Sequence, residues 1–294
     1  MVNYKSKFLK YKLKYEKLNL KNKSINGGGF INFCKNALGC PDSDSTSIPA
    51  PGPAPAPTST PPVRSRRYLR QQLKRNDDDI RLAINTWYED DSPNKSFAIR
   101  RFGDISLWNV EDVTNMSKLF QNMRNFNEDI SRWNVSNVTD MSFMFQDARN
   151  FDQDLSQWDV SNVTNMSFMF YNAHVFNQDL DQWNVSKVTN MSHMFSGAFA
   201  FRHVSLSQWD VSQVTNFESM FDGASTFNGN ISNWDVSSAT NMREMFSYAH
   251  KFFQDLSGWD VSNVTDSTDM FDWSRLALNP PAWYDGYRSP IYDA

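Results

Sequence analysis

The sequence lacks several features that would point to familiar classes of protein. Its two cysteines, Cys34 and Cys40, are too few for a disulfide framework or a four-ligand zinc site. We expect two incidental thiols, with one small loop closure as the alternative. No stretch approaches the roughly 20 apolar residues of a membrane-spanning helix, so we expect no transmembrane segment. The N-terminus also lacks the continuous apolar segment of a secretory signal.

Patterns of catalytic and metal-binding residues are equally scarce. No Ser/His/Asp arrangement stands out, no glycine loop fits a phosphate, and no pair of likely metal ligands has a suitable spacing. Aspartates do recur in the second half of the chain, and they predict either Ca²⁺ binding or, as we favour, hydrogen bonds in turns and at strand edges. They are Asp154, Asp179, Asp255, Asp159, Asp210 and Asp235. We therefore expect a protein that is not an enzyme and needs no cofactor.

Charge is divided unevenly along the chain. The whole sequence of 294 residues has 29 basic and 33 acidic side chains, for a net charge of −4. Residues 1–75 hold 15 of the basic and only 3 of the acidic side chains, whereas the remainder holds 14 and 30. A cationic segment of +12 therefore precedes an acidic one of −16, and such asymmetry points to separate roles for the two parts.

The cationic part has two segments. Residues 1–29 place apolar side chains every three or four positions among eight lysines, which predicts a basic amphipathic leader helix. Such a helix can lie on an anionic membrane, bind nucleic acid or pair with another helix. Residues 30–76 contain alternating prolines between Pro49 and Pro57, followed by a cluster of arginines. We expect a stiff, disordered linker and a basic, solvent-exposed hinge.

From about residue 77 the sequence is periodic. Seven tryptophans are separated by 25 residues, with one interval of 26: Trp108, Trp133, Trp158, Trp183, Trp209, Trp234 and Trp259. Counting from each tryptophan as position zero, the third repeat has apolar residues at +8, +11, +12 and +15: Met166, Met169, Phe170 and Ala173. This spacing predicts a short helix, and the alternation over Leu155–Val160 predicts a short strand.

One strand and one helix cannot bury their apolar faces alone, so the repeats must stack on one another. We therefore predict an α/β solenoid, a leucine-rich-repeat-like, right-handed stack of about seven strand–helix coils over residues 105–271. The basic helix and the disordered linker precede it. Asp77–Asp79 followed by an apolar stripe predicts an N-terminal cap over residues 77–104. The aromatic residues after the last repeat predict a C-terminal cap over residues 272–294.

The repeat has a family resemblance. Residues 158–170 read Trp-Asp-Val-Ser-Asn-Val-Thr-Asn-Met-Ser-Phe-Met-Phe, and this unit resembles the repeats of BspA-like leucine-rich-repeat surface proteins. The resemblance covers roughly residues 77–275. It implies a surface-displayed interaction module and carries over no catalytic residue. The chain departs from bacterial members of that family because no signal or lipoprotein-anchor sequence is recognisable in it.

The N-terminus has a resemblance of its own. The Lys/Tyr/Leu order of residues 7–18, followed by Gly27–Gly29, resembles the leader of many proteins of Mimivirus-type giant viruses. This resemblance implies a viral protein located in the host cytoplasm or in the virion.

Positions that vary between otherwise constant repeats are candidates for recognition. We predict that positions −1, +10 and +13 face solvent, and that they form an interaction surface. The candidate residues are Arg132 at −1, Phe143, Phe168 and His193 at +10, and Tyr171 at +13. The alternative is tolerated surface variation.

Two functional hypotheses follow from these features. The first is a non-enzymatic repeat protein that mediates interaction with a protein or glycan. The second is a structural virion component that its cationic N-terminus tethers to DNA, to a membrane or to an acidic protein. Nucleic acid or an anionic membrane would then be a partner of the N-terminal segment alone.

Overall fold

The computed structural model describes residues 74–88, 94–202 and 206–286, all of which belong to one unit that spans residues 60–294. The predicted leader helix and the proline-rich part of the linker lie outside the described residues. The regular elements are few, and they lie near the two ends of the described chain. They are β1 (Lys74–Asn76), α4 (Asp77–Tyr88), α5 (Asn94–Phe102), η1 (Ile105–Leu107), β2 (Asn109–Asp112) and η2 (Arg275–Leu278). No helix among the described residues is long and apolar enough to span a membrane.

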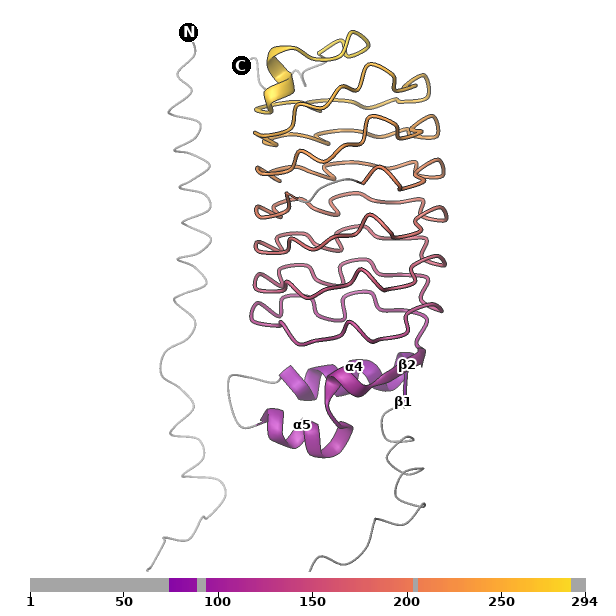
Figure 1. Ribbon diagram of the computed structural model, residues 1–294, viewed down its shortest axis with the longest axis vertical. Helices are drawn as coiled ribbons and strands as arrows, with labels where there is room; N and C mark the ends of the chain where they lie inside the picture. Colours follow the sequence, from indigo (N-terminus) through magenta and orange to yellow (C-terminus); the bar gives the residue numbers. More distant parts are fainter. Residues whose placement is uncertain (1–73, 89–93, 203–205, 287–294) are drawn as a thin grey trace, which may run out of the picture. The chain divides into compact units, whose positions relative to one another are not determined.

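Between these elements the chain forms a stack of coils, one for each 25-residue repeat, which we call the coil stack (Figure 1). Parallel bridges join the residue at position +7 of each coil to the same position of the next. The bridged residues are Asn115, Asp140, Asn165, Asn190, Asn216, Asn241 and Asp266. The column of parallel bridges means that each coil lies directly on its neighbour with the chain running in the same sense.

The helix that the apolar spacing predicted does not form. Residues 166–173 are a chain of turns in which alternate N–H groups have different acceptors. The Met169 N–H closes a turn onto the Met166 carbonyl (3.2 Å), whereas the Phe168 N–H donates to the Ser192 carbonyl of the next coil (2.8 Å). The chain of turns still directs the four predicted apolar residues into the core, and all four are buried. The next coil thus supplies carbonyl acceptors for these N–H groups. A single repeat on its own could satisfy the same N–H groups only by forming a helix.

The strand predicted over Leu155–Val160 is also absent. Trp158 N–H donates to the Leu155 carbonyl at 3.0 Å, which closes a turn in place of extended chain. The indole Nε1 of Trp158 donates to the Ile130 carbonyl of the preceding coil at 3.2 Å. Leu155, Trp158 and Val160 are buried as the alternation predicted, but the chain that carries them is irregular.

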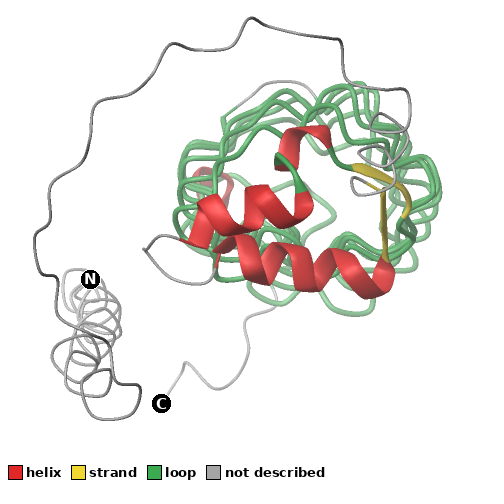
Figure 2. Ribbon diagram, turned by 90° about the horizontal axis from the view of Figure 1, so that it is seen from below, coloured by secondary structure: helices red, strands yellow, loops and turns green. Residues whose placement is uncertain are grey.

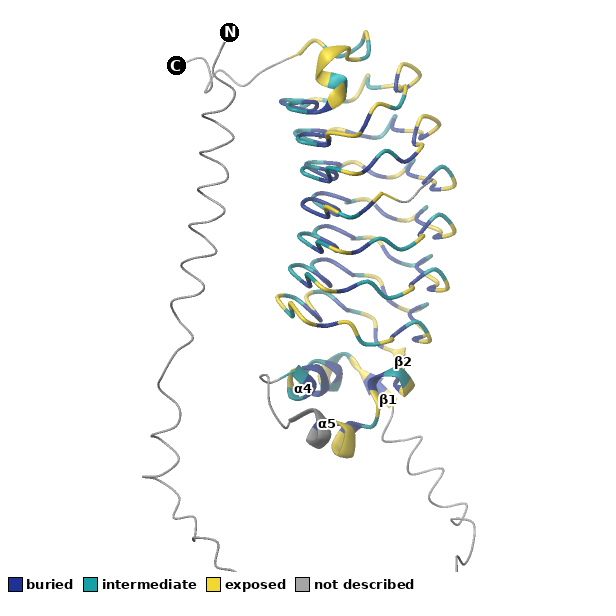
Figure 3. Ribbon diagram, turned by 60° about the vertical axis from the view of Figure 1, so that its left-hand side comes forward, coloured by how far each residue is buried: buried dark blue, intermediate teal, exposed yellow. Residues whose placement is uncertain are grey.

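Aromatic rings fill the interior in regular columns. In each pair of Phe residues at +12 and +18 the rings stack at about 4 Å, for example Phe195 and Phe201 at 4.1 Å. Rings at +12 follow one another from coil to coil, as between Phe195 and Phe221 at 5.7 Å. Figure 3 shows the resulting alternation of buried and exposed residues around every coil. Burying a Phe side chain contributes about 1.5–3 kcal/mol, so these columns contribute strongly to stability.

Helix α4 closes the N-terminal end of the coil stack (Figure 2). In later coils the Thr N–H at +6 donates to the Thr carbonyl of the preceding coil, as Thr139 does to Thr114 at 2.9 Å. Thr114 has no preceding coil, and its N–H donates instead to Asp77 Oδ1 at 2.8 Å. The Thr114 hydroxyl donates to Oδ2 of the same carboxylate at 2.7 Å. Asp77 therefore supplies the acceptor that a missing coil would have provided.

One turn further along α4, Arg81 supplies the missing donors. The carbonyls at +7 and +9 normally accept N–H groups of the preceding coil. In the first coil Arg81 Nη1 donates to the Ser117 carbonyl at 2.6 Å, and Nη2 lies 3.5 Å from the Asn115 carbonyl. Tyr88 Oη, like Asp77, replaces an acceptor, because it accepts the Asn125 N–H at 2.8 Å where Asn150 of the second coil donates to the Arg124 carbonyl. The cap that the sequence predicted from charge and apolar spacing thus imitates the backbone of a coil.

The described structure includes β1, which lies just before the predicted domain boundary at residue 77. β1 pairs in parallel with β2, and Arg75 within β1 is only 4% exposed. Its Nη2 donates to the Phe102 carbonyl at 2.7 Å, and its guanidinium carbon lies 4.7 Å from the centre of the Trp108 ring. The prediction of a solvent-exposed hinge is therefore wrong for Arg75, whose planar guanidinium packs on aromatic rings and anchors β1.

At the C-terminal end, Trp283 continues the tryptophan column. Its ring stacks on that of Trp259 at 6.4 Å, and its Nε1 donates to the Leu256 carbonyl at 2.8 Å. Each repeat tryptophan from Trp133 onward makes the same bond to the preceding coil. Trp283 follows Trp259 by 24 residues, so a search for a 25-residue interval does not find it. The described part of the predicted cap therefore ends the stack with one more ring.

Candidate functional site

Position +10 has an unusual backbone conformation in every coil. All seven residues there are left-handed, with φ between 51° and 61°: Lys118, Phe143, Phe168, His193, Ser219, Glu244 and Asp269. A left-handed residue turns the chain so that its N–H reaches the next coil, as Phe168 does with Ser192. We call the side chains at +10 and +13 the turn face. This conformation is costly for residues other than glycine.

The turn face of the first four coils carries an aromatic cluster. The rings of Phe143 and Phe168 stack at 4.7 Å, and those of Phe168 and His193 at 4.3 Å. Lys118 Nζ lies 5.4 Å from the centre of the Phe143 ring. Tyr171 packs beside the row, 5.5 Å from Phe168 and edge-on to His193 at 6.2 Å. We call these five residues the aromatic ladder.

Four of the five residues that the sequence selected therefore lie together, and one does not. Phe143, Phe168, Tyr171 and His193 are partly exposed members of the ladder. Arg132 is exposed at position −1, close enough to Asp129 to lower the pKa of that carboxyl slightly, after the larger effect of hydrogen bonds from Ser131. It takes no part in the ring contacts of the ladder. The sequence did not single out Lys118, although its place at +10 was the available signal.

Beyond His193 the turn face becomes acidic. Asp222 at +13 and Glu244 at +10, together with Glu218 at the adjoining position +9, lie next to the ladder, and we call these three residues the acidic patch. Glu218 and Glu244 are close enough to His193 to oppose the lowering of its pKa that burial causes. Arg243 Nη2 pairs with Glu244 Oε1 at 2.9 Å and offsets one of the three carboxylates. Since burial lowers the pKa of His193, the ladder ends in a neutral imidazole near pH 7.

Asp222 is the most strongly perturbed carboxyl of the patch. Burial raises its pKa to about 7, with a further contribution from the nearby charge of Glu244. Ser196 Oγ donates to Asp222 Oδ2 at 3.4 Å and favours the ionised form, as does Ser247. The patch therefore gains or loses a proton near neutral pH, so its charge depends on conditions there.

We expect Asp222→Asn to stabilise the protein at pH 8. Because the pKa of folded Asp222 is raised above its unfolded value, its contribution to stability is present in acid and is lost as pH rises from about 4 to about 7. The amide stays neutral, so the free energy of unfolding at pH 8 should rise by on the order of 1–3 kcal/mol. Urea denaturation between pH 4 and pH 8 measures the effect.

The matched control is Asp179→Asn, at an exposed position where the sixth repeat already has an asparagine, Asn230. It should leave the pH dependence unchanged. Equal pH profiles for wild type and Asp222→Asn would contradict the raised pKa.

The recurring aspartates have a structural role in the coils. Asp154 Oδ1 accepts the N–H of Ser156 at 2.8 Å, and Asp159 Oδ1 accepts that of Ser161 at 3.1 Å. These are turn hydrogen bonds within one coil. Among the residues for which the structure gives a placement, no three His, Cys, Asp or Glu side chains are grouped so that they could hold a metal ion.

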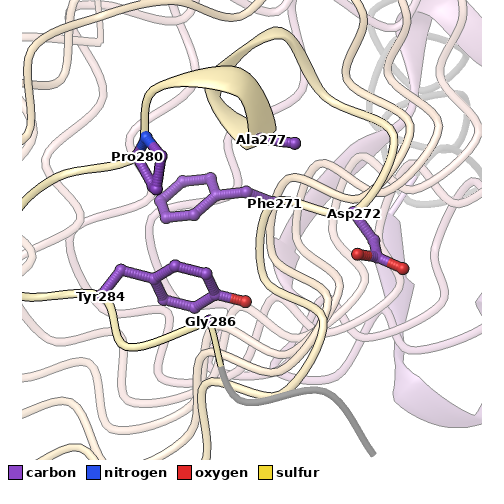
Figure 4. A pocket seen from close by; sticks show the side chains of 6 residues that line it. All are labelled: Phe271, Asp272, Ala277, Pro280, Tyr284 and Gly286. Atoms are coloured by element: carbon purple, nitrogen blue, oxygen red, sulfur yellow. The ribbon is translucent and has the colours of Figure 1, made fainter. Parts of the chain in front are cut away.

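A small pocket lies at the C-terminal end of the coil stack (Figure 4). Its lining residues come from the last coil and the cap: Phe271, Asp272, Ala277, Pro280, Tyr284 and Gly286. Tyr284 packs edge-on against Phe271 at 4.9 Å, and burial raises the pKa of its hydroxyl to about 12. These contacts hold the cap on the last coil, so we assign the pocket a structural role.

The fold and the turn face define a repeat protein of stacked coils with one differentiated surface. Residues 93–208 and 198–283 match the family described as Mycoplasma protein of unknown function, DUF285. The matches cover more than half of the chain, so the protein belongs to this family. The match fits the resemblance to BspA-like repeats. Comparison with curated proteins and with solved structures finds no match.

Proposed function

We propose that this chain is a non-enzymatic repeat protein whose turn face binds a protein or glycan partner. In this proposal the coil stack is a right-handed solenoid of the leucine-rich-repeat-like class. The column of parallel bridges and the advance of one coil per repeat support that assignment.

One contrast between two left-handed columns carries the proposal. Position +14 is left-handed as well, and five of its seven residues are the types that tolerate this conformation: Asn122, Asp147, Asn172, Gly197 and Gly223. At +10 the second and third coils have Phe143 and Phe168 instead. A bulky residue there costs about 1–3 kcal/mol, so a purely structural position would favour glycine or asparagine. Phe143 and Phe168 are therefore better explained by what their rings contact than by the backbone conformation they adopt.

The ladder supports binding more than catalysis. Its partly exposed rings form a row of neighbouring apolar surface, and aromatic side chains are frequent anchors of interfaces. Lys118 and His193, its two members with basic side chains, each lie against a phenylalanine ring. Because both basic side chains pack on rings, these contacts support a surface that binds a partner by burying apolar area.

A capture experiment tests the proposal. We expect the triple variant Phe143→Ser, Phe168→Ser and Tyr171→Ser of the full-length chain to lose partners that wild type captures after cross-linking in extracts of its source cells. The control carries Arg132→Ser, Gln157→Ser and Gln182→Ser, three exposed residues at −1. It should retain those partners. Identical partner sets for wild type and the ladder variant would overturn the proposal.

A structural component tethered by its N-terminus, of the kind that the giant-virus resemblance implies, is the second candidate. The net charge of +12 over residues 1–75 favours it. In the same experiment this role predicts partners that wild type, ladder variant and control all retain, and that high salt releases, because contacts of lysine and arginine with phosphates weaken steeply with salt.

A further inference from the structure

We propose that the turn face binds an extended polypeptide whose apolar side chains meet the aromatic ladder and whose lysine or arginine side chains meet the acidic patch. This inference rests on the proposed binding function and decides between its two kinds of partner. Three features of the turn face support it: the orientation of the rings, the length of the stack, and the division of charge along it.

The orientation of the rings argues against a sugar. Aromatic residues commonly bind sugars by laying a free ring face against the C–H groups of the ligand. In the ladder both faces of Phe143 are covered, by Lys118 on one side and by Phe168 on the other. Phe168 in turn lies between Phe143 and His193, with interplanar angles of 7° and 20°. Phe143 and Phe168 therefore present ring edges to solvent.

The exposed ring edges can interact favourably with the aromatic side chains and backbone carbonyls of a polypeptide. The edge of an aromatic ring carries partial positive charge, which attracts the face of another ring or a carbonyl oxygen. Tyr171 shows the geometry within the protein itself, since it packs edge-on to His193 at 6.2 Å. Leu, Phe or Tyr side chains of a partner can occupy the same kind of position along the row, and its backbone carbonyls can face the edges.

The length of the turn face fits a short extended segment. Seven coils separated by about 4.8 Å give a face of roughly 29 Å along the stack. An extended chain advances about 3.3 Å per residue, so roughly nine residues would run from the first coil to the last. The ladder, on the first four coils, and the acidic patch, on the fifth and sixth, would then contact different parts of one segment.

The distribution of charge determines which part of the bound segment lies on the ladder and which part lies on the acidic patch. The only formally charged residue of the ladder near pH 7 is Lys118, whereas the patch has two glutamates and Asp222, whose pKa is about 7, against the single guanidinium of Arg243. Two of these carboxylates reach back to the preceding coil, because Ser219 Oγ donates to Glu244 Oε2 at 3.4 Å and Ser196 Oγ donates to Asp222 Oδ2 at 3.4 Å. The third, Glu218, accepts from Asn241 Nδ2 at 3.2 Å and acts with Glu244 on His193. A partner with an apolar half and a basic half complements this surface, and an acidic partner is repelled.

Synthetic peptides test the inference directly. The first probe is a nine-residue peptide with an apolar block of leucine and phenylalanine, then glycine, then four lysines. A second has glutamate in place of every lysine, and a third probe is a hexasaccharide of N-acetylglucosamine. With full-length protein in fluorescence anisotropy, we expect the lysine peptide to bind about tenfold or more tightly than the glutamate peptide, and the sugar not to bind.

Variants locate the binding. Phe168→Ser and Glu244→Gln should each weaken the lysine peptide by about threefold to tenfold, whereas Asp179→Asn, at an exposed carboxylate outside the patch, should not. Added salt should weaken binding to wild type more than to Glu244→Gln.

Failure of this inference is separable from failure of the proposed function. Equal binding of the two peptides, no peptide binding up to about 1 mM, or ladder-dependent binding of the sugar would each overturn the polypeptide inference. In any of those cases, partners that depend on the ladder in the capture experiment would still uphold the binding function. Loss of ladder dependence in both experiments would remove both proposals.

Discussion

The double variant Asp77→Ala and Arg81→Ala is expected to lower the free energy of unfolding by about 2–4 kcal/mol. The Asp77 carboxylate accepts the N–H groups of Thr114 and Asn115, and Arg81 donates to the carbonyl of Ser117. Without them the first coil keeps backbone groups that no neighbouring coil can satisfy. Urea denaturation followed by tryptophan fluorescence measures the loss, and hydrogen exchange should locate it in the first coil.

Asp78→Ala is the matched control, because Asp78 lies in the same helical turn and is exposed. It should cost no more than about 0.5 kcal/mol, through its interaction with the helix dipole. If the double variant loses no more stability than Asp78→Ala, then α4 covers the stack without replacing the hydrogen bonds of a coil.

The cap should also respond to acid. Partial burial works to raise the pKa of Asp77, but hydrogen bonds from Thr114 and Asn115 outweigh it, and the pKa is lowered. A carboxyl whose folded pKa is lowered stabilises the protein above its unfolded pKa and loses that contribution as pH falls. The difference between wild type and the double variant should therefore shrink below about pH 4.

The variant Phe195→Ala, in the middle of the coil stack, is expected to lower the free energy of unfolding by about 3–5 kcal/mol. This loss is at least as large as that expected for the double variant of the cap. Phe195 is fully buried, and its ring stacks on Phe170, Phe201 and Phe221 at 5.6, 4.1 and 5.7 Å. Removing it leaves a cavity between coils. In a stack each coil contacts only its neighbours, so the two halves should also unfold less cooperatively, as a broader urea transition.

The control for this variant is Phe253→Ala. Phe253 is 50% exposed, and its ring faces the guanidinium of Arg275 at 4.6 Å. Its loss should cost about 1 kcal/mol or less. If the two substitutions cost the same, the stacked Phe columns would add no more stability than an exposed aromatic contact does.

Much of the candidate site was predictable from the repeat. The positions +10 and +13 stood out because they vary while their neighbours do not, and Phe143, Phe168, Tyr171 and His193 do meet in space. The reason is that a stack superposes equal positions of successive repeats. Arg132 lies apart from the ladder because position −1 occupies another part of the coil. The high pKa of Asp222 was not predictable, since it depends on burial beside Ser196 and Glu244.

The backbone was predictable only in part. An apolar pattern of i, i+3, i+4 and i+7 specifies which side chains point inward, and Met166–Ala173 obeys it. The pattern does not specify where the N–H groups go. A helix and a chain of turns bury the same residues, and the choice depends on carbonyls supplied by the next coil, such as that of Ser192 for Phe168.

The sequence by itself determined the number of coils, the inward-facing residues, the need for caps and the split between a cationic N-terminus and an acidic repeat region. Tertiary structure decided what depends on contact between coils. It placed two left-handed residues in each repeat, set Asp77 and Arg81 in the place of a missing coil, and added Trp283 to the tryptophan column. The physical reason is that periodicity records burial, whereas hydrogen-bond partners 25 residues apart exist only once the coils have stacked.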